Sequence, residues 1–463
     1  MSIEEMKNDL FYSPKHAAVV GGDEVVAQAN EFAEGYKVFL DNAKTEREAT
    51  VEVVKMAKAQ GFVEFDPAVS CKAGDKVYYV NREKAIILAV IGKKPVAEGV
   101  KIAAAHIDSP RLDLKPNPLY ETDDLALFKT HYYGGIKKYQ WVAIPLALHG
   151  VIVKADGTKV DVKIGEEEGE PKFVISDILP HLGAEQGKRT LSEGIAGEEL
   201  NVIVGSLPFK NDKGSELVKL NVLRLLNEKY GIKEADFLSA ELEVVPAFKA
   251  DDIGFDRGLI GSYGHDDRVC AYPAAMAIFS IENPEYTALT VLTDKEETGS
   301  DGNTGLQSAY MVNFISHLAK AQGTEGYIVL SNSECLSADV NSAYDPTFSS
   351  VFEKNNTSFL NRGVVITKYT GARGKGGTSD ASAEYMGKIR KLLDDNNVVW
   401  QIGELGKVDA GGGGTVAKYV ANLDVDVVDL GVPVLSMHAP YEVISKLDLY
   451  MAFKAFAKFM EQK

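Results

Sequence analysis

The chain has 463 residues, enough for about three domains of ordinary size or for one large domain with an insert. Apolar residues make up 45% and charged residues 25% of it, which excludes a disordered or fibrous chain. The formal net charge of −17 would repel phosphate groups and anionic membrane surfaces, so no nucleic-acid or membrane partner is expected.

The sequence also bears on the compartment of the protein. The first sixteen residues lack the basic stretch and apolar run of a secretory signal. Every apolar run is shorter than the roughly 18 residues that a membrane span needs. Cys71, Cys270 and Cys335 lie far apart and form no CxxC pair, which is typical of free thiols in a reducing compartment. We therefore expect a cytoplasmic protein.

The first part of the chain predicts helices that cover a sheet. Apolar residues recur at helical spacing over residues 23–60, which indicates one or two amphipathic helices. Three β-rich runs follow at residues 77–80, 85–91 and 100–105, and the last leads directly into His106. A predicted strand thus ends at a histidine.

The pattern changes between residues 114 and 246. Strand-like segments recur there, with one helix near residues 216–228. This predicts a separate β-rich insert at 114–246 that interrupts a main domain formed by residues 1–113 and 247–463.

After the insert, helices and strands alternate. Helices are predicted from Arg268 and over 304–319, 381–393 and 443–460, and strands over 288–293, 327–330 and 425–430. This alternation predicts an α/β fold with a mainly parallel sheet sandwiched by helices. In such sheets ligands bind beyond the carboxyl ends of the strands.

Possible metal ligands occur at five of these predicted strand ends. They are His106 with Asp108, Asp266 with Asp267, Glu296 with Glu297, Asp339, and His438. Histidines with carboxylates suit Zn²⁺, Mn²⁺ or Co²⁺, and shared carboxylates suit two ions about 3.5–4 Å apart. Each place alone also fits a helix cap, a solvated turn or a buried histidine. The set indicates a metal site, because we expect all five places to follow strands of one sheet.

Five short segments, in chain order, carry a resemblance to a known family. They are AHIDSP at 105–110, GHDDR at 264–268, DKEETGS at 294–300, SAD at 337–339 and LSMH at 435–438. Together they resemble the aspartyl aminopeptidases and yeast-type aminopeptidase I, the eighteenth family of metallopeptidases. The resemblance implies a zinc-exopeptidase fold and an enzyme that removes amino-terminal residues from peptides.

The resemblance implies two zinc ions per subunit, with Co²⁺ or Mn²⁺ as possible substitutes. Asp266 would bridge the ions, His106 and Asp339 would complete one site, and Glu297 and His438 the other. Asp267 is the weaker candidate for the bridging ligand, since the motif here reads Asp-Asp-Arg.

Two more carboxylates take catalytic roles by the same resemblance. Asp108 would orient the His106 ring, and Glu296 would be the general base.

The resemblance also gives the insert a role. It implies that the insert builds a dimer, that dimers assemble into a dodecamer, and that a histidine of the insert reaches the partner's active site. His181 matches that histidine, and the alternative is an ordinary surface residue.

Specificity stays open between acidic and neutral first residues. Lys375 matches the family's basic residue near the substrate side chain, although a solvated lysine is equally ordinary. The segment after Asp339 lacks the histidine of the acid-specific relatives. The glycines at 411–414 fit either backbone approach to a peptide or a flexible turn.

The sequence therefore predicts a dizinc aminopeptidase. A deacylase or carboxypeptidase on the same scaffold and a catalytically inactive assembly shell are the alternatives.

Overall fold

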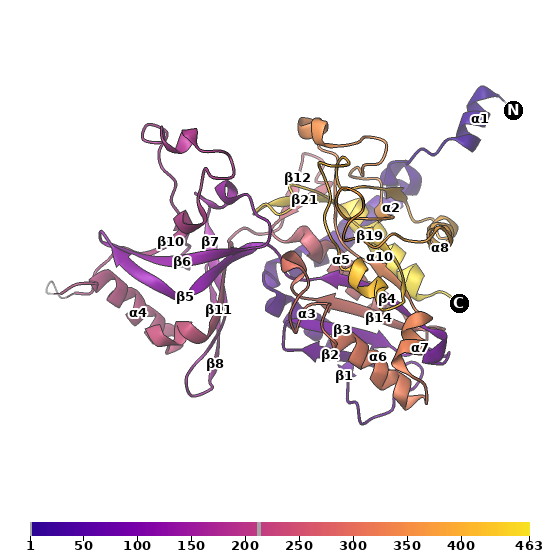
Figure 1. Ribbon diagram of the computed structural model, residues 1–463, viewed down its shortest axis with the longest axis horizontal. Helices are drawn as coiled ribbons and strands as arrows, with labels where there is room; N and C mark the ends of the chain where they lie inside the picture. The colour runs from indigo at the N-terminus through magenta and orange to yellow at the C-terminus, as the bar shows by residue number, and fades with distance from the viewer. Residues whose placement is uncertain (1, 211–213) are drawn as a thin grey trace.

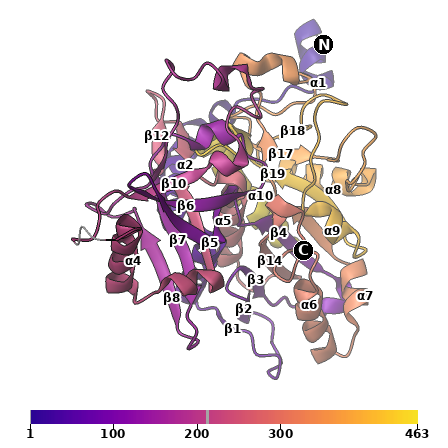
Figure 2. The same cartoon turned by 60° about the vertical axis from the view of Figure 1, so that its left-hand side comes forward.

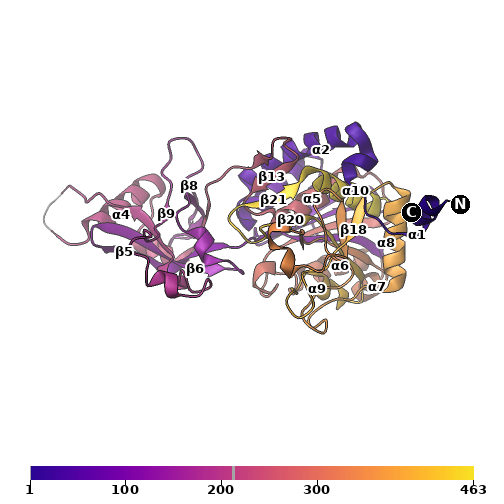
Figure 3. The same ribbon diagram turned by 90° about the horizontal axis from the view of Figure 1, so that it is seen from above.

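The computed structural model describes residues 2–210 and 214–463, which form two lobes (Figures 1 and 3). The larger lobe is built on a nine-stranded sheet. Its strands are β1 (Val63–Glu64), β2 (Lys76–Asn81), β3 (Ala85–Val90), β4 (Val100–His106), β14 (Thr287–Thr293), β15 (Glu334–Ser337), β17 (Val364–Thr367), β18 (Trp400–Ile402) and β19 (Asp426–Gly431). They lie in the order β1-β2-β3-β14-β4-β15-β19-β17-β18. Five of the eight strand pairs are parallel, so the sheet is mixed.

Helices contribute to hydrophobic cores on both faces of this sheet. The helices of the first core are α2 (Ala17–Asn42), α3 (Glu46–Ala59), α5 (His265–Ser280), α8 (Ala383–Asp395) and α10 (Lys446–Met460). The helices of the second are α6 (Tyr310–Ala321), α7 (Gly326–Ser331) and α9 (Ala417–Ala421). A further helix, α1 (Ile3–Leu10), lies at the N-terminus away from both cores (Figure 1). The expected α/β character is confirmed.

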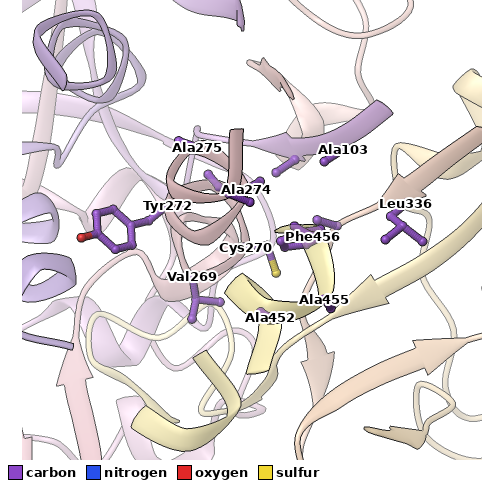
Figure 4. Packing of buried hydrophobic residues seen from close by; sticks show 14 of the residues in the cluster. Ala103, Val269, Cys270, Tyr272, Ala274, Ala275, Leu336, Ala452, Ala455 and Phe456 are labelled. Atoms are coloured by element: carbon purple, nitrogen blue, oxygen red, sulfur yellow. The ribbon is translucent and has the colours of Figure 1, made fainter. Parts of the chain in front are cut away.

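Small residues allow α5 and α10 to lie close to each other and to the sheet. Figure 4 shows Ala274 and Ala275 of α5 in one packed cluster with Ala452, Ala455 and Phe456 of α10. Every residue of β3 is buried, as is usual for a strand covered on both faces. The packing therefore holds the central strands in place, and the candidate site lies at the carboxyl ends of these strands.

A smaller sheet of five strands lies in the same lobe. The strands are β12 (Asp251–Ile253), β13 (Leu259–Ser262), β16 (Asn341–Ser342), β20 (Pro433–Leu435) and β21 (Glu442–Ser445). Their order is β12-β13-β21-β20-β16. The sequence does not predict this second sheet, because its strands are only two to four residues long.

The second lobe is an antiparallel sheet of seven strands with its own core (Figure 2). The strands are β5 (Arg111–Thr122), β6 (Leu125–Tyr133), β7 (Leu146–Val153), β8 (Lys159–Ile164), β9 (Val174–Ile175), β10 (Asn201–Gly205) and β11 (Ala240–Pro246), in the order β8-β7-β11-β5-β6-β10-β9. Helix α4 (Leu217–Tyr230) packs on it. The lobe thus spans residues 111–246.

One predicted element is wrong, and two predicted helices begin later than expected. Residues 327–330 form most of helix α7 and not a strand, and β15 lies a few residues later. A short apolar run does not distinguish a buried strand from a single helical turn. The helix expected at 304–319 begins at Tyr310. The helix expected at 443–460 begins at Lys446, because the residues before it pair as β21. Within the described residues, no helix combines the length and apolar character of a membrane span.

Candidate metal centre

Three of the predicted ligand positions meet where neighbouring strands of the large sheet end. His106 is the last residue of β4, Glu296 and Glu297 form the turn after β14, and Asp339 follows β15. Strands β14, β4 and β15 are adjacent and parallel. Their carboxyl ends therefore bring these four side chains together.

Asp266 and His438 come from the small sheet. Asp266 follows β13 and His438 follows β20. The expectation that all five places follow strands of one sheet is thus wrong for these two. A strand-end residue has the same sequence pattern whichever sheet its strand joins, so the sequence could not separate them.

The Asp266 carboxylate lies between the two histidines. Its Oδ1 is 3.2 Å from Nε2 of His106, and its Oδ2 is 3.2 Å from Nε2 of His438. Asp339 Oδ1 lies 3.8 Å from His106 Nε2, and Glu297 Oε2 lies 3.5 Å from His438 Nε2. The five side chains therefore fall into two groups that share Asp266.

Several possible ligand atoms of the cluster have no hydrogen-bond partner in the part of the chain that the structure describes. His106 Nε2, Asp266 Oδ1 and Glu297 Oε1 are buried and have no hydrogen-bond partner among the described residues. Ligand atoms of His106, Asp266 and Glu297 all lie within 4.8 Å of one another, as do those of His106, Glu296 and Asp339. Buried polar atoms that lack a hydrogen bond are costly. Bound divalent cations would remove that cost.

Asp108 holds the loop that carries the two glutamates. Its Oδ1 accepts the backbone N–H of Glu296 and its Oδ2 that of Glu297, each at 3.2 Å, and the Tyr133 hydroxyl donates to Oδ2 at 2.8 Å. Oδ1 also lies 3.3 Å from Nδ1 of His106. Burial opposes ionisation of Asp108, but the contacts with His106 and Tyr133 outweigh it and lower the pKa of the carboxyl. The sequence offers no signal for Tyr133, which comes from the other lobe.

Glu296 is the partly open carboxylate of the cluster. Its side chain is 18% exposed, against 4% for Glu297, and its Oε2 lies 3.9 Å from Nε2 of His106. Burial raises the pKa of Glu296 to about 7, and the charges of Asp108 and Asp266 add to the rise while His106 opposes it. Without cations nearby, this carboxyl is poised to bind a proton near neutral pH.

A cavity of about 430 Å³ opens onto this cluster. Asp266, Glu296, Glu297, Asp339 and His438 line one side of it. Most of the other lining residues come from loops, and include Val340, Thr370, Gly377, Leu405, Gly412, Gly413, Gly414 and Thr415, whereas Lys418 and Tyr419 come from helix α9. Three glycines of the run at 411–414 thus border the space where a substrate would lie. Lys418, which the sequence analysis does not single out, also lines the cavity.

Three other candidates lie outside this arrangement. His181 is exposed in the loop after β9 of the second lobe. Lys375 is not among the lining residues; its Nζ lies 2.7 Å from Asp380 and 3.7 Å from the centre of the Tyr369 ring. Asp267 is fully buried behind the cluster, where its Oδ2 accepts the N–H of His106 at 3.3 Å. Asp266, and not Asp267, faces both histidines.

Comparison with known proteins decides the family. Residues 39–460 match the family described as aminopeptidase I zinc metalloprotease (M18). The chain belongs to this family. The resemblance found in the sequence is thereby confirmed, and the chain is an aminopeptidase of the zinc metallopeptidase class, a hydrolase that acts as an exopeptidase.

Relatives and solved structures agree with this assignment. A probable M18 family aminopeptidase 1 of Clostridium acetobutylicum is 48% identical over 98% of this chain and 100% of its own. The crystal structure of an M18 aminopeptidase from Thermotoga maritima superposes with a TM-score of 0.93 at 44% identity, covering 98% of this chain and 100% of the other. The fold is also that of one chain in the structure of the S. cerevisiae mApe1 dodecamer, with a TM-score of 0.76 at 19% identity, covering 94% of this chain and 97% of the other.

Proposed function

We propose that this M18 aminopeptidase uses two zinc ions, with Co²⁺ or Mn²⁺ as possible substitutes. The observation that carries the proposal is the Asp266 carboxylate, which presents one oxygen to each histidine. His106 and Asp339 would complete one ion site, and Glu297 and His438 the other. Zinc ions bound there would polarise the peptide carbonyl and lower the pKa of a bound water molecule.

Glu296 acts as the general base in this proposal. Its carboxylate lines the cavity without lying between the histidines, so it is free to take a proton from water and to deliver it to the leaving amine. Asp108 fixes the Glu296–Glu297 turn and the His106 ring, because it touches all three. The adjacent glutamates thus divide metal binding and proton transfer between them.

We propose a preference for Asp or Glu as the first residue of the peptide. Lys418 lines the cavity, and Lys375 lies in the loop whose Gly377 lines it. A charge-assisted contact with a lysine contributes about 1.5–3 kcal/mol. The pair that Lys375 forms with Asp380 favours the alternative, a neutral first residue such as Leu. Rates for Asp, Glu and Leu reporter substrates on Lys375→Ala and Lys418→Ala decide between them.

The insert serves assembly in this proposal. We propose that the seven-stranded lobe forms a dimer contact, that dimers build a dodecamer, and that His181 enters the partner's site. The exposure of His181 and of the nearby Leu179 and Leu182 supports a contact surface at this loop.

We also propose a cytoplasmic location, which the free thiols of Cys71, Cys270 and Cys335 support.

The deciding test compares free and blocked amino termini. Zinc-loaded protein is assayed with a panel of aminoacyl reporter substrates and with their N-acetyl forms. We expect turnover of the free α-amine substrates alone. Equal turnover of the acetylated forms would favour a deacylase, and no turnover of any member would favour an inactive assembly shell.

A further inference from the structure

Glu442 occupies a central place in the five-stranded sheet. It is the first residue of β21, which pairs antiparallel with β13 on one side and with β20 on the other. Strands β13 and β20 therefore end beside the start of β21. These are the two strands that lead to Asp266 and His438.

The Glu442 carboxylate joins the two ligand segments. Its Oε2 accepts the backbone N–H of Asp266 at 3.0 Å, and its Oε1 accepts the backbone N–H of His438 at 2.7 Å. The residue is only 1% exposed, so water does not replace these contacts. One rigid group thus fixes the spacing between two segments that are far apart in the sequence.

The backbone around His438 adopts a conformation that neighbouring contacts must stabilise. His438 has a φ of 65° and Ser436 a φ of 59°, in the left-handed region that residues other than glycine rarely adopt. Such conformations persist only where the surroundings impose them. The hydrogen bond to Glu442 is one of the contacts that hold this turn in place.

We infer that Glu442 is a positioning residue of the metal centre. It does for Asp266 and His438 what Asp108 does for the turn of Glu296 and Glu297, because in each case one buried carboxylate accepts two backbone N–H groups. The inference rests on the proposed pair of metal ions. It predicts that loss of the Glu442 carboxylate weakens metal binding without unfolding the chain.

Asp448 provides a matched control. It is fully buried and its carboxylate accepts the N–H groups of Asn361 and Gly363 at 2.7 and 2.6 Å, but neither segment carries a proposed ligand. Glu442→Gln and Asp448→Asn each replace one carboxylate oxygen by an NH2 group, which donates hydrogen bonds and cannot accept one from an N–H. Glu442→Asp retains the charge on a side chain too short to reach both segments.

The experiment measures zinc affinity by competition with a chelator and the absorption spectrum of the Co²⁺-loaded protein, with thermal unfolding as the structural readout. We expect Glu442→Gln and Glu442→Asp to bind zinc about 10–100-fold more weakly and to change the Co²⁺ spectrum. Asp448→Asn should keep the zinc affinity and the Co²⁺ spectrum of the wild type, even if its melting temperature falls as much as those of the Glu442 variants.

Three outcomes would overturn the inference. Wild-type affinity in both Glu442 variants would do so, as would an equal loss of affinity in Asp448→Asn. Failure of both Glu442 variants to fold, where Asp448→Asn folds, would assign Glu442 to the fold alone. Wild-type protein that binds fewer than two ions would instead contradict the proposed metal site, so the two failures are distinguishable.

Discussion

At the residue scale, the adjacent Glu296 and Glu297 have different surroundings and so should differ on substitution. Glu296→Gln removes a proton acceptor but no proposed ligand, so kcat should fall by about 10²–10⁴-fold while both zinc ions stay bound. Glu297→Gln should instead lose zinc. Steady-state rates and metal content of the two variants measure this. If the two variants kept both ions and wild-type rates, the assignment of roles would be wrong.

The proposed ligands His106 and Glu297 could be located from the sequence because each follows a strand that the sequence predicts. The strands before Asp266, Asp339 and His438 are not predicted, so these three positions depend on the motifs that carry the family resemblance. What the sequence could not show is contact through the backbone. Glu442 acts on the site through the backbone N–H groups of two other segments, which carry no sequence pattern because every residue except proline has one. Tyr133 acts through its hydroxyl, which donates to Asp108, and only the fold brings this residue of the other lobe to the site. Lys375 shows the reverse case, in which a motif match does not specify where the side chain points.

At the scale of elements, the helix and strand alternation of the second half could be predicted, but the division of its strands between two sheets could not. Strands of two to four residues have too few positions for a pattern. The exchange of strand for helix at Gly326–Ser331 has the same cause. Long elements such as α2, α3 and α10 follow the sequence pattern more closely, because their buried faces repeat over several turns.

The end of β19 gives a prediction at this scale. A Cβ atom on Gly431 would lie 1.6 Å from the backbone oxygen of Asp339, so a side chain there must displace the segment that carries this proposed ligand. We expect Gly431→Ala to weaken zinc binding and to destabilise the fold by about 1–3 kcal/mol. Zinc titration and urea unfolding measure the two effects.

Gly387 is the control for this substitution. It lies on the exposed face of α8, and a Cβ atom there would meet nothing within 4 Å. Gly387→Ala should keep zinc affinity and stabilise the helix by about 1 kcal/mol. Equal zinc affinity in both alanine variants would show that the contact between β19 and Asp339 does not position the ligand.

At the scale of the whole molecule, a buried ionic cluster joins the two lobes. The His149 ring of β7 lies between Glu48 of α3, at 2.8 Å, and Glu166 at 3.0 Å. Lys44 also pairs with Glu166 at 2.9 Å, and donates to the carbonyl oxygens of Pro246 and Phe248. Because α3 belongs to the larger lobe and β7 to the other, this cluster couples their positions.

His149 predicts a dependence of stability on pH. Burial lowers the pKa of His149, but the hydrogen bonds to Glu166 and Glu48 outweigh it and raise the pKa above its ordinary value. Its contribution to stability is therefore complete below about pH 6.5, the unfolded pKa, and is lost as pH rises through the folded pKa. His149→Gln should cost about 1.5–3 kcal/mol at pH 6 and less at higher pH, by urea unfolding. A cost that does not change with pH would contradict the charged state of His149.

Assembly gives a second prediction for the whole molecule. If His181 enters the partner's site, His181→Phe should lower kcat by about 10²-fold, as the loss of an oxyanion donor does. Mixing His181→Phe subunits with Glu296→Gln subunits should then restore activity, because one hybrid site holds both intact groups. Hybrids that form, as shown by native mass spectrometry, and stay inactive would contradict a shared site.

The central claim is that two metal ions lie on either side of the Asp266 carboxylate. Crystals of the zinc-loaded protein, measured above and below the zinc absorption edge, test it most directly. The account predicts two anomalous peaks, one beside His106 and Asp339 and one beside Glu297 and His438, with Asp266 between them. A single peak, or two peaks joined by Asp267 in place of Asp266, would contradict it.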